Sequence, residues 1–454
     1  MRRVKSASRR SITSPTRSRR HARLPLALLE SLESRWLLND APAMYGAEPM
    51  GAIDEDAINN GTLVATLIGA NGADADPGDV LGIAVTGVVN ANGQWQYSID
   101  NGMTWNELGA PSTTESRLLG PDDVVRFVPN ADWSGTVTDG LSFRGWDQSA
   151  GTAGTLVDVS VNGDITPYSA EEVYSSIVVN AVNDIPSFTK GGDVSIAEDA
   201  GAQSTDGWAT ALSAGPADEA GQTLSFEVST NNDALFSAVP AIDSTGKLTF
   251  TPAVDASGTA TVTVRLKDNG GIAAGGVDTS ADQTFTITVT PVNDAPVLAG
   301  TQNLTAINED ATTNTGTLVS DLILGQTIDA DSGALKGIAI TAVDTTHGTW
   351  EYTTDGGTTW TAIAGVANTT ALLLAADANT RVRFVPTANW NGTVTAGLTF
   401  RAWDQTTGTA GATADTTTNG TTTAFSTATA QANIAVNAVN DVPSFTKGGD
   451  VSIA

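Results

Sequence analysis

Oxygen-bearing side chains recur in one short pattern along this chain. The sequence Val-Asn-Asp-x-Pro occurs at residues 182–186, 292–296 and 439–443. Carboxylate and amide oxygens are the ligands that calcium prefers, six to eight at a time and in tolerant geometry. Asn and Asp are also common turn formers, which is the simpler explanation for any single pair. The recurrence of the whole pattern favours calcium sites, and we expect calcium to be the only cofactor.

Other catalytic chemistry has few candidate residues. The chain contains no cysteine and only two histidines, His21 and His347. A Ser–His–Asp triad, a Cys–His pair and a zinc site are therefore almost excluded. Acidic residues are so numerous that any two of them would match an acid–base pair by chance. We therefore expect no enzymatic activity.

A second pattern combines Asp, Gly, Thr and Trp. Residues 98–105 read SIDNGMTW and residues 353–360 read TTDGGTTW, which resembles the Asp-box of sialidase-like proteins. The resemblance implies a hairpin turn away from any catalytic centre, in which the carboxylate accepts backbone N–H bonds. The tryptophans of each repeat are predicted to be core residues, and a sugar-stacking face is the alternative. The tryptophans concerned are Trp95, Trp105, Trp133, Trp146, Trp350, Trp360, Trp390 and Trp403.

Charge separates the N-terminus from the rest of the chain. The 454 residues carry 22 Lys and Arg against 50 Asp and Glu, a net charge of −28. Residues 1–40 hold ten of the basic residues and only three acidic ones. The remaining, strongly acidic part repels nucleic acid and anionic lipid and attracts cations. We therefore expect no nucleic-acid partner. No stretch of 18 apolar residues is present, so we also expect no transmembrane segment.

Strands must position these oxygens, because each linker follows an alternating, β-branched segment. These segments are residues 176–181, 284–289 and 432–437, and proline then prevents a central strand from continuing. The linkers predict module A1 at 41–184, module B1 at 185–294 and module A2 at 295–441. The start of module B2 would occupy 442–454.

Internal repetition supports this division. Residues 443–454 repeat residues 186–197 letter for letter, and an offset of 254–257 residues aligns A1 with A2. Repetition on this scale indicates an array of modules. The sequence stops within a repeat, so we expect a longer parent protein.

Short strands and frequent turns fill each module. We expect residues 81–89 and 95–99 to form a hairpin around Asn92–Gly93, with a second turn at 100–102. About seven strands per hundred residues are typical of a two-sheet sandwich. The predicted fold class is all-β: tandem β-sandwich modules in an elongated array, preceded by a disordered basic N-terminus.

The linkers give the chain a family resemblance. It resembles the tandem cadherin-like and Ig-like repeats of large bacterial surface adhesins, whose modules close on V-N-D-x-P. The resemblance implies calcium ligands: an early Glu, the linker Asn-Asp, a D-x-D pair in the next module and a late Asp. At the B1–A2 junction these are Glu198, Asn293, Asp294, Asp329, Asp331 and Asp404.

The same pattern implies ligands at the other junctions. The first linker would use Asp40, Asp74, Asp76 and Asp147. The A1–B1 junction would use Glu55, Asp184, Asp218 and Asp268, where Asp218–Glu219 replaces the D-x-D pair. Glu309 and Asp441 would serve the junction after A2.

The N-terminal 40 residues contain a targeting-like motif. Residues 32–38, LESRWLL, resemble the LEPR-x-LL motif at the N-termini of very large bacterial surface or secreted proteins, with Ser34 in place of proline. The alternative is an amphipathic helical stub that follows a basic tail. The motif implies an extracellular or cell-surface location in a bacterium.

Together these features predict a calcium-stiffened, multi-module, non-catalytic extracellular adhesion protein. Its partner would be a cell-surface or matrix ligand, either glycan or protein, or a like chain. The alternatives are a carbohydrate-binding repeat array appended to an enzyme in a longer parent chain, and a passive spacer stalk.

Overall fold

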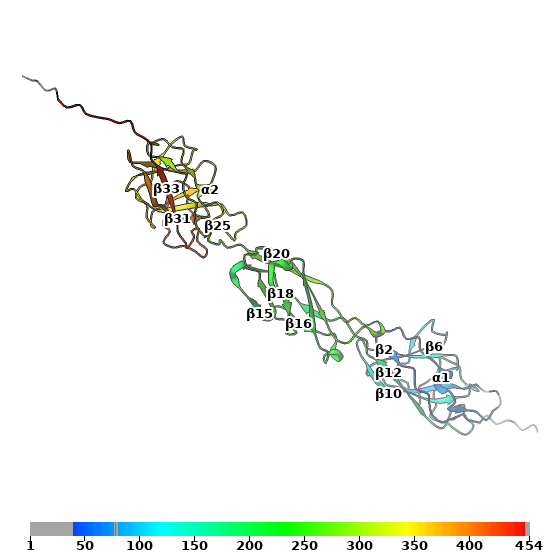
Figure 1. Ribbon diagram of the computed structural model, residues 1–454. Coiled ribbons are helices and arrows are strands. Elements are labelled where there is room, and N and C mark those ends of the chain that lie inside the picture. Colours follow the sequence, from blue (N-terminus) through cyan, green and yellow to red (C-terminus); the bar gives the residue numbers. More distant parts are fainter. Residues whose placement is uncertain (1–39, 77, 79, 450–454) are drawn as a thin grey trace, which may run out of the picture. The chain divides into compact units, whose positions relative to one another are not determined.

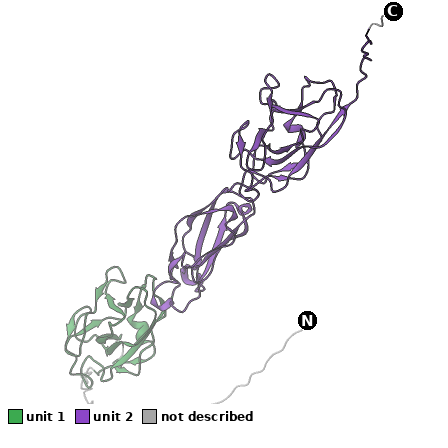
Figure 2. Cartoon of the chain, turned by 90° about the vertical axis from the view of Figure 1, so that its left-hand side faces the viewer, with its two compact units in different colours: residues 1–181 green, residues 182–454 purple. Residues whose placement is uncertain are grey.

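The computed structural model describes residues 40–76, 78 and 80–449. The predicted disordered tail and the LEPR-x-LL-like motif lie outside these residues. The chain divides into two compact units, residues 1–181 and 182–454 (Figure 2). Nearly all regular structure in the described residues is β-strand, as the sequence predicts.

Unit 1 contains the sandwich of module A1. A six-stranded sheet has the order β11-β8-β5-β10-β12-β2, and a four-stranded sheet has the order β3-β9-β6-β7. The strands of the two sheets are β2 (Ile53–Asp54), β3 (Thr62–Leu63), β5 (Gly82–Val88), β6 (Gly93–Ser98), β7 (Asn106–Glu107), β8 (Ser116–Leu119), β9 (Val124–Pro129), β10 (Gly135–Trp146), β11 (Leu156–Val157) and β12 (Val173–Asn180). The remaining elements are β1 (Ala43–Met44), β4 (Gly72–Ala73) and the short helix α1 (Val64–Ile68).

The core of A1 forms between the two sheets because side chains alternate along the strands. Ile177 of β12 and Phe143 of β10 pack with Trp95 and Phe127 of the opposite sheet. In Figure 1 β10 and β12 lie side by side, as their antiparallel pairing requires.

One hairpin prediction is wrong. Strands β5 and β6, which flank Asn92–Gly93, belong to different sheets. Strand β5 already pairs with β10 on one side and β8 on the other, so it has no free edge for β6. The second predicted turn does close a hairpin, in which β6 pairs with β7.

The first sandwich of unit 2 is module B1. Its sheets have the orders β14-β21-β20-β17 and β15-β19-β18, with a small pair β13-β16. Its elements are β13 (Ser187–Thr189), β14 (Val194–Ala197), η1 (Glu198–Ala200), β15 (Gln203–Thr205), β16 (Thr210–Ser213), η2 (Ala217–Glu219), β17 (Ser225–Thr230), η3 (Asp233–Leu235), β18 (Phe236–Ile242), β19 (Leu248–Pro252), β20 (Gly258–Lys267), η4 (Ala273–Gly275) and β21 (Gln283–Thr290).

Module A2 repeats the topology of A1. Its sheets are β23-β33-β31-β26-β29-β32 and β24-β30-β27-β28. Its elements are β22 (Val297–Leu298), β23 (Ile307–Asn308), β24 (Thr317–Leu318), α2 (Val319–Leu322), β25 (Thr327–Ile328), β26 (Gly337–Val343), β27 (Gly348–Thr353), β28 (Thr361–Ala362), β29 (Ala371–Ala375), β30 (Arg381–Pro386), β31 (Gly392–Trp403), β32 (Thr413–Ala414) and β33 (Ala430–Asn437).

The repeated tryptophans fall into two groups. Four of them are at most 2% exposed and belong to the core: Trp95, Trp146, Trp350 and Trp403. The other four are only half-buried: Trp105, Trp133, Trp360 and Trp390. The prediction that they are core residues is confirmed for the first group, and Trp133 and Trp390 of the second group also pack against the cores of their modules.

In modules B1 and A2 the second strand lies beside the last strand. Strand β14 pairs in parallel with β21, and β23 pairs in parallel with β33. Glu198 directly follows β14 and Glu309 directly follows β23, so each glutamate lies where the last strand leaves the module. None of the described helices is long and apolar enough to span a membrane.

Candidate metal centre

Three carboxylates meet at linker 2, which we define as Val292–Asp294. Glu198, Asp294 and Asp331 each offer an oxygen, and these oxygens lie within 4.8 Å of one another. Two backbone N–H groups of the linker hold the outer members in place. The Val292 N–H donates to Glu198 Oε1 at 2.8 Å, and the Asp294 N–H donates to Asp331 Oδ2 at 2.8 Å.

Asp329 supports this cluster from the same loop as Asp331. The Asp331 N–H donates to Asp329 Oδ1 at 3.0 Å. The second oxygens of Asp329 and of Asp294 are buried and accept no hydrogen bond. Burying a charged oxygen without a partner costs free energy, unless the group is protonated or a cation binds it.

The electrostatics of linker 2 agree with this geometry. Burial raises the pKa of Asp294, and the neighbouring carboxylates Asp199, Asp255, Asp331 and Glu198 raise it further. The pKa of Asp329 is also raised, mainly by burial and then by Asp331 and Asp404, against the backbone bond from Asp331. The cluster is a region of unbalanced negative charge that favours a bound proton or metal ion.

Asn293 anchors linker 2 to module A2. Its side-chain amide donates to Asp404 Oδ2 at 3.0 Å and to the Thr423 carbonyl at 3.3 Å. Asp404 is 2% exposed, and its Oδ1 accepts bonds from the backbone and the hydroxyl of Thr406. Asp404 therefore fixes the linker amide.

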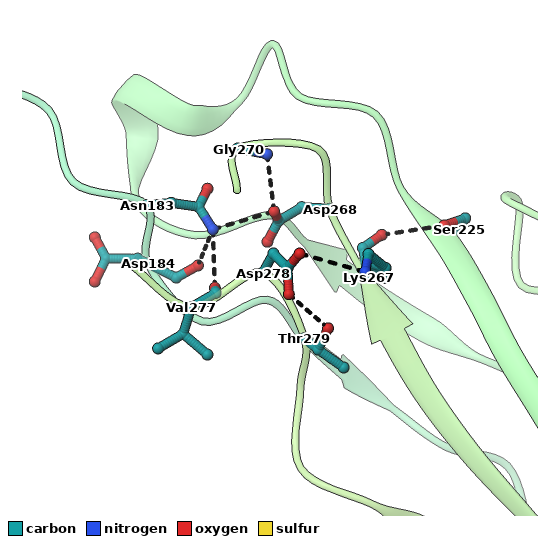
Figure 3. A network of polar contacts seen from close by, with 9 residues as sticks. All are labelled: Asn183, Asp184, Ser225, Lys267, Asp268, Gly270, Val277, Asp278 and Thr279. Atoms are coloured by element: carbon teal, nitrogen blue, oxygen red, sulfur yellow. Dashed lines mark hydrogen bonds and ion pairs between the residues drawn. The ribbon is translucent and has the colours of Figure 1, made fainter. Parts of the chain in front are cut away.

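Linker 1, which we define as Val182–Asp184, has a related arrangement (Figure 3). The Asn183 side-chain amide donates to Asp268 Oδ1 at 3.1 Å and to the Val277 carbonyl at 2.8 Å. The Gly270 N–H also donates to Asp268 Oδ1, at 3.0 Å. Asp268 is only 4% exposed, and its Oδ2 is buried and accepts no hydrogen bond.

Glu219 completes linker 1, where the resemblance implies its neighbour Asp218 as the ligand. The Asp184 N–H donates to Glu219 Oε1 at 2.8 Å, whereas Glu219 Oε2 is buried without a hydrogen bond. Glu219 is 5% exposed, while Asp218 lies exposed. Burial raises the pKa of Glu219 most, and Asp184, Asp218 and Asp268 add to the shift against the bond from Asp184.

A spacing signal in the sequence points to Glu219. Asp331 follows the linker aspartate to which it bonds by 37 residues, and Asp76 follows Asp40 by 36. Glu219 follows Asp184 by 35 residues. A spacing of 35–37 residues therefore indicates Glu219 as the partner of Asp184 within the Asp218–Glu219 pair.

The first linker, in unit 1, shows the same local bonds. The Asp40 N–H donates to Asp76 Oδ2 at 2.9 Å, and the Asp76 N–H donates to Asp74 Oδ1 at 2.8 Å. Asp147 is 3% exposed and accepts a bond from the Ser149 N–H at 2.7 Å. Glu55 is 7% exposed and follows β2 in unit 1.

The end of A2 contains only part of the pattern. Glu309 is 4% exposed and accepts bonds from the Val439 N–H at 2.7 Å and from the Asn391 amide at 2.9 Å. These bonds, led by that of Val439, lower its pKa despite burial. Asp441 is exposed in the extended segment that follows.

The Asp-box residues form turns. Asp100 accepts bonds from the Thr104 N–H at 2.8 Å and from the Thr104 hydroxyl at 2.6 Å, and these bonds, with one from Ser98, lower its pKa to about 2. Asp355 has matching bonds and a lowered pKa, with the Thr353 hydroxyl as the largest cause. Each carboxylate organises its own turn.

The residues at linkers 1 and 2 suit a hard cation. Within the described residues the sites consist of carboxylate, amide and carbonyl oxygens, without sulfur or imidazole, and such oxygens bind calcium or magnesium. At each linker two buried carboxylate oxygens accept no hydrogen bond and could donate to such an ion.

Comparisons with known proteins give similarity only at the level of solved structures. No family model and no curated protein matches the chain. Mouse protocadherin-24 EC1-3 is 13% identical over 78% of this chain and 93% of its own, with a TM-score of 0.34. Human protocadherin-24 EC1-2 is 16% identical over 57% of this chain and 100% of its own, with a TM-score of 0.31.

A third structure covers more of the chain. The cadherin-like domains 1 to 4 of zebrafish RET are 9% identical over 87% of this chain and 76% of their own, with a TM-score of 0.25. TM-scores this low establish neither a shared family nor a shared function.

Proposed function

We propose that the chain is a non-catalytic, multi-module adhesion protein of the bacterial cell surface whose linkers bind calcium. One observation carries the proposal. At linkers 1 and 2, four buried carboxylate oxygens accept no hydrogen bond, on Glu219, Asp268, Asp294 and Asp329. Native proteins rarely leave such groups unsatisfied, because the desolvation cost is not offset.

Calcium suits these donors better than magnesium. Calcium accepts six to eight oxygens in flexible geometry, whereas magnesium demands a near-ideal octahedron and retains water. The carboxylates come from loops of different length and from both Asp and Glu, which favours the more tolerant ion. Glu198, Asp294, Asp329 and Asp331 would hold it at linker 2, and Asp184, Glu219 and Asp268 would hold it at linker 1.

Metal binding at linker 2 would stiffen the array. Glu198 belongs to module B1, Asp331 belongs to module A2, and Asp294 lies in the linker between these two residues in sequence. An ion shared by all three would restrain bending at the linker, and it would offset the burial and the repulsion that together raise the pKa of Asp294. A chain of stiffened sandwiches can hold a binding surface away from the cell, toward a glycan, a protein or a like chain.

Differential scanning calorimetry of the 454-residue chain tests the calcium sites. We expect millimolar calcium to raise the melting temperature relative to EDTA, because a ligand of the folded state stabilises it by about 2.7 kcal/mol at 100 times its Kd. Magnesium at equal ionic strength is expected to have a smaller effect. A melting temperature that is the same in calcium and in EDTA would refute the proposal.

A matched variant separates specific binding from screening. Glu227 is exposed on β17, so Glu227→Gln removes one charge away from the linkers and should retain the calcium shift.

Beads coated with the chain test the adhesive role. Calcium-dependent clustering, or capture on a bacterial or matrix surface, supports adhesion, whereas a calcium shift without any binding would leave a stiff spacer.

A further inference from the structure

Basic side chains are concentrated at one place in module A2. Residues 295–441 contain only four, and two of these, Arg381 and Arg383, occupy alternate positions of β30 on the same face. They line a pocket of about 550 Å³. We call this the Arg pocket, and its lining residues are Thr313, Asn314, Thr315, Gly356, Gly357, Trp360, Arg381 and Arg383.

Arg383 is neutralised and positions Trp360. Its guanidinium lies 4.0 Å from the centre of the Trp360 ring. Its Nε donates to Glu351 Oε2 at 2.7 Å, and its Nη2 lies 2.6 Å from the same oxygen. Because Glu351 compensates the charge, Arg383 serves to hold the indole against β30.

Arg381 has no such compensation among the described residues. Among the described residues its guanidinium forms one hydrogen bond, from Nη1 to the Gly316 carbonyl at 3.5 Å, which is the long limit for such a bond. No acidic side chain forms an ion pair with it in the part of the chain that the structure describes. Its planar fork of N–H donors is therefore available to an anion in the pocket.

Module A1 provides an internal comparison. Arg126 lies 3.8 Å from the Trp105 ring centre and donates to Gln96 at 2.8 Å, so the Trp–Arg stack is present in both modules. Strand pairing matches Ser98 with Val124 in A1 and Thr353 with Arg381 in A2. Val124 thus takes the place of Arg381, and only A2 has a second guanidinium on this face of the strand, beside the one that stacks on the tryptophan.

We propose that the Arg pocket of module A2 binds a carboxylate-bearing pyranose, the uronic acid unit of an acidic polysaccharide. Arg381 would donate two parallel N–H bonds to the carboxylate in a bidentate pair. Trp360 supplies an apolar surface for the flat side of a sugar ring, and the hydroxyls of Thr313 and Thr315 can bond sugar hydroxyls. The inference is independent of the linker sites, because none of these residues belongs to them.

A saccharide accounts for this lining better than an acidic peptide does. A carboxylate alone would need only the guanidinium, whereas an indole and two hydroxyls beside it match a ring that carries both apolar and hydroxyl groups. The acidic character of the rest of the chain repels polyanions in general. Binding therefore requires the specific pocket.

Titration calorimetry with tetragalacturonate tests the pocket, with EDTA present so that calcium cannot bridge protein and sugar. We expect one site per chain, and at least tenfold weaker binding for the fully methyl-esterified tetramer. Arg381→Val should weaken binding at least tenfold and leave the melting temperature unchanged, since A1 folds with valine there. Arg381→Lys should retain part of the affinity.

Equal affinity for the acid and the ester, or an unchanged affinity in Arg381→Val, would overturn the proposal. Tetraglutamate that binds as tightly as the sugar would replace the saccharide with an acidic peptide. None of these outcomes affects the calcium experiment, so the two proposals fail separately.

Discussion

Linkers 1 and 2 share the sequence Val-Asn-Asp but obtain their carboxylates differently. At linker 2 the Asp294 N–H bonds to Asp331, which is itself held by Asp329 two residues earlier. At linker 1 the Asp184 N–H bonds to Glu219, and alanine stands two residues before it. A longer side chain reaches the same backbone group from a different loop. The site therefore depends on the position of the carboxylate oxygen, and the sequence pattern that supplies this oxygen differs between the two linkers.

The difference also concerns the number of donors. Linker 2 combines three mutually close carboxylates with Asp329, whereas linker 1 has an extra amide, Gln222, which donates to the Asn183 oxygen at 2.8 Å. An amide that donates to a linker oxygen occupies a position that a cation would otherwise use. We expect linker 2 to bind calcium more tightly than linker 1.

The largest expected effect is at Asp331. Asp331→Asn retains an oxygen for the Asp294 N–H but removes one charge from the cluster. We expect calcium affinity at linker 2 to fall at least tenfold, and each tenfold change in Kd corresponds to about 1.4 kcal/mol. Titration calorimetry should show one class of site lost, while the melting temperature in EDTA stays equal to or above that of the wild type. If Asp331→Asn binds as many calcium ions as the wild type, and as tightly, then Asp331 does not give linker 2 a higher calcium affinity than linker 1.

A smaller effect, with a diagnostic sign, is expected at Glu219. Glu219→Asp shortens the side chain and loses the bond to Asp184, which should destabilise the metal-free chain by about 1 kcal/mol. Glu219→Gln keeps an acceptor and relieves repulsion, so it should stabilise the metal-free chain and weaken the calcium response. Chemical denaturation in EDTA measures both variants. Opposite signs are expected, and equal losses would mean that Glu219 only fills space.

The smallest expected effect concerns pH. The folded pKa values of Glu219, Asp294 and Asp329 are raised, so the folded, metal-free chain binds protons more readily than the unfolded chain. As the pH falls from neutral through these raised pKa values, stability in EDTA should rise, by less than about 4 °C in Tm. Asp100 and Asp355 have lowered pKa values and lose their contribution only below the ordinary carboxyl range.

Calcium should reverse this dependence, because protons compete with the ion for the same oxygens. Melting curves between pH 7.5 and 5, with and without calcium, should therefore converge as the pH falls. Parallel curves would show that the raised pKa values and the metal response belong to different groups.

Much of the fold could be predicted from the sequence, since alternation and turn residues act locally. Residues 284–289, for example, alternate as expected and lie within β21. The hairpin around Asn92–Gly93 could not be judged this way. Whether β6 pairs with β5 depends on β8 and β10, which occupy both edges of β5 and come later in the chain.

The candidate site was predictable to the same extent. The linker Asn-Asp pairs and the D-x-D loops are short patterns, and the structure brings Asp294 and Asp331 together. The short patterns indicate the Asp218–Glu219 pair but not that Glu219 is the residue that bonds to the linker, because that depends on the reach of one side chain across 35 residues. The Arg pocket could not be predicted from the sequence. Nothing in the sequence distinguishes Arg381 from other arginines, and the pocket depends on which segments lie beside β30.

The parallel pairing of β14 with β21 has a mechanical consequence. Four residue pairs join these strands, from Val194 with Ile287 to Ala197 with Thr290. Tension applied to the two ends of module B1 pulls these strands along each other. The hydrogen bonds between them then bear the load together instead of breaking one after another. Strands β23 and β33 join the ends of module A2 in the same way. Shear loading of this kind would suit the stiff, surface-attached array proposed above.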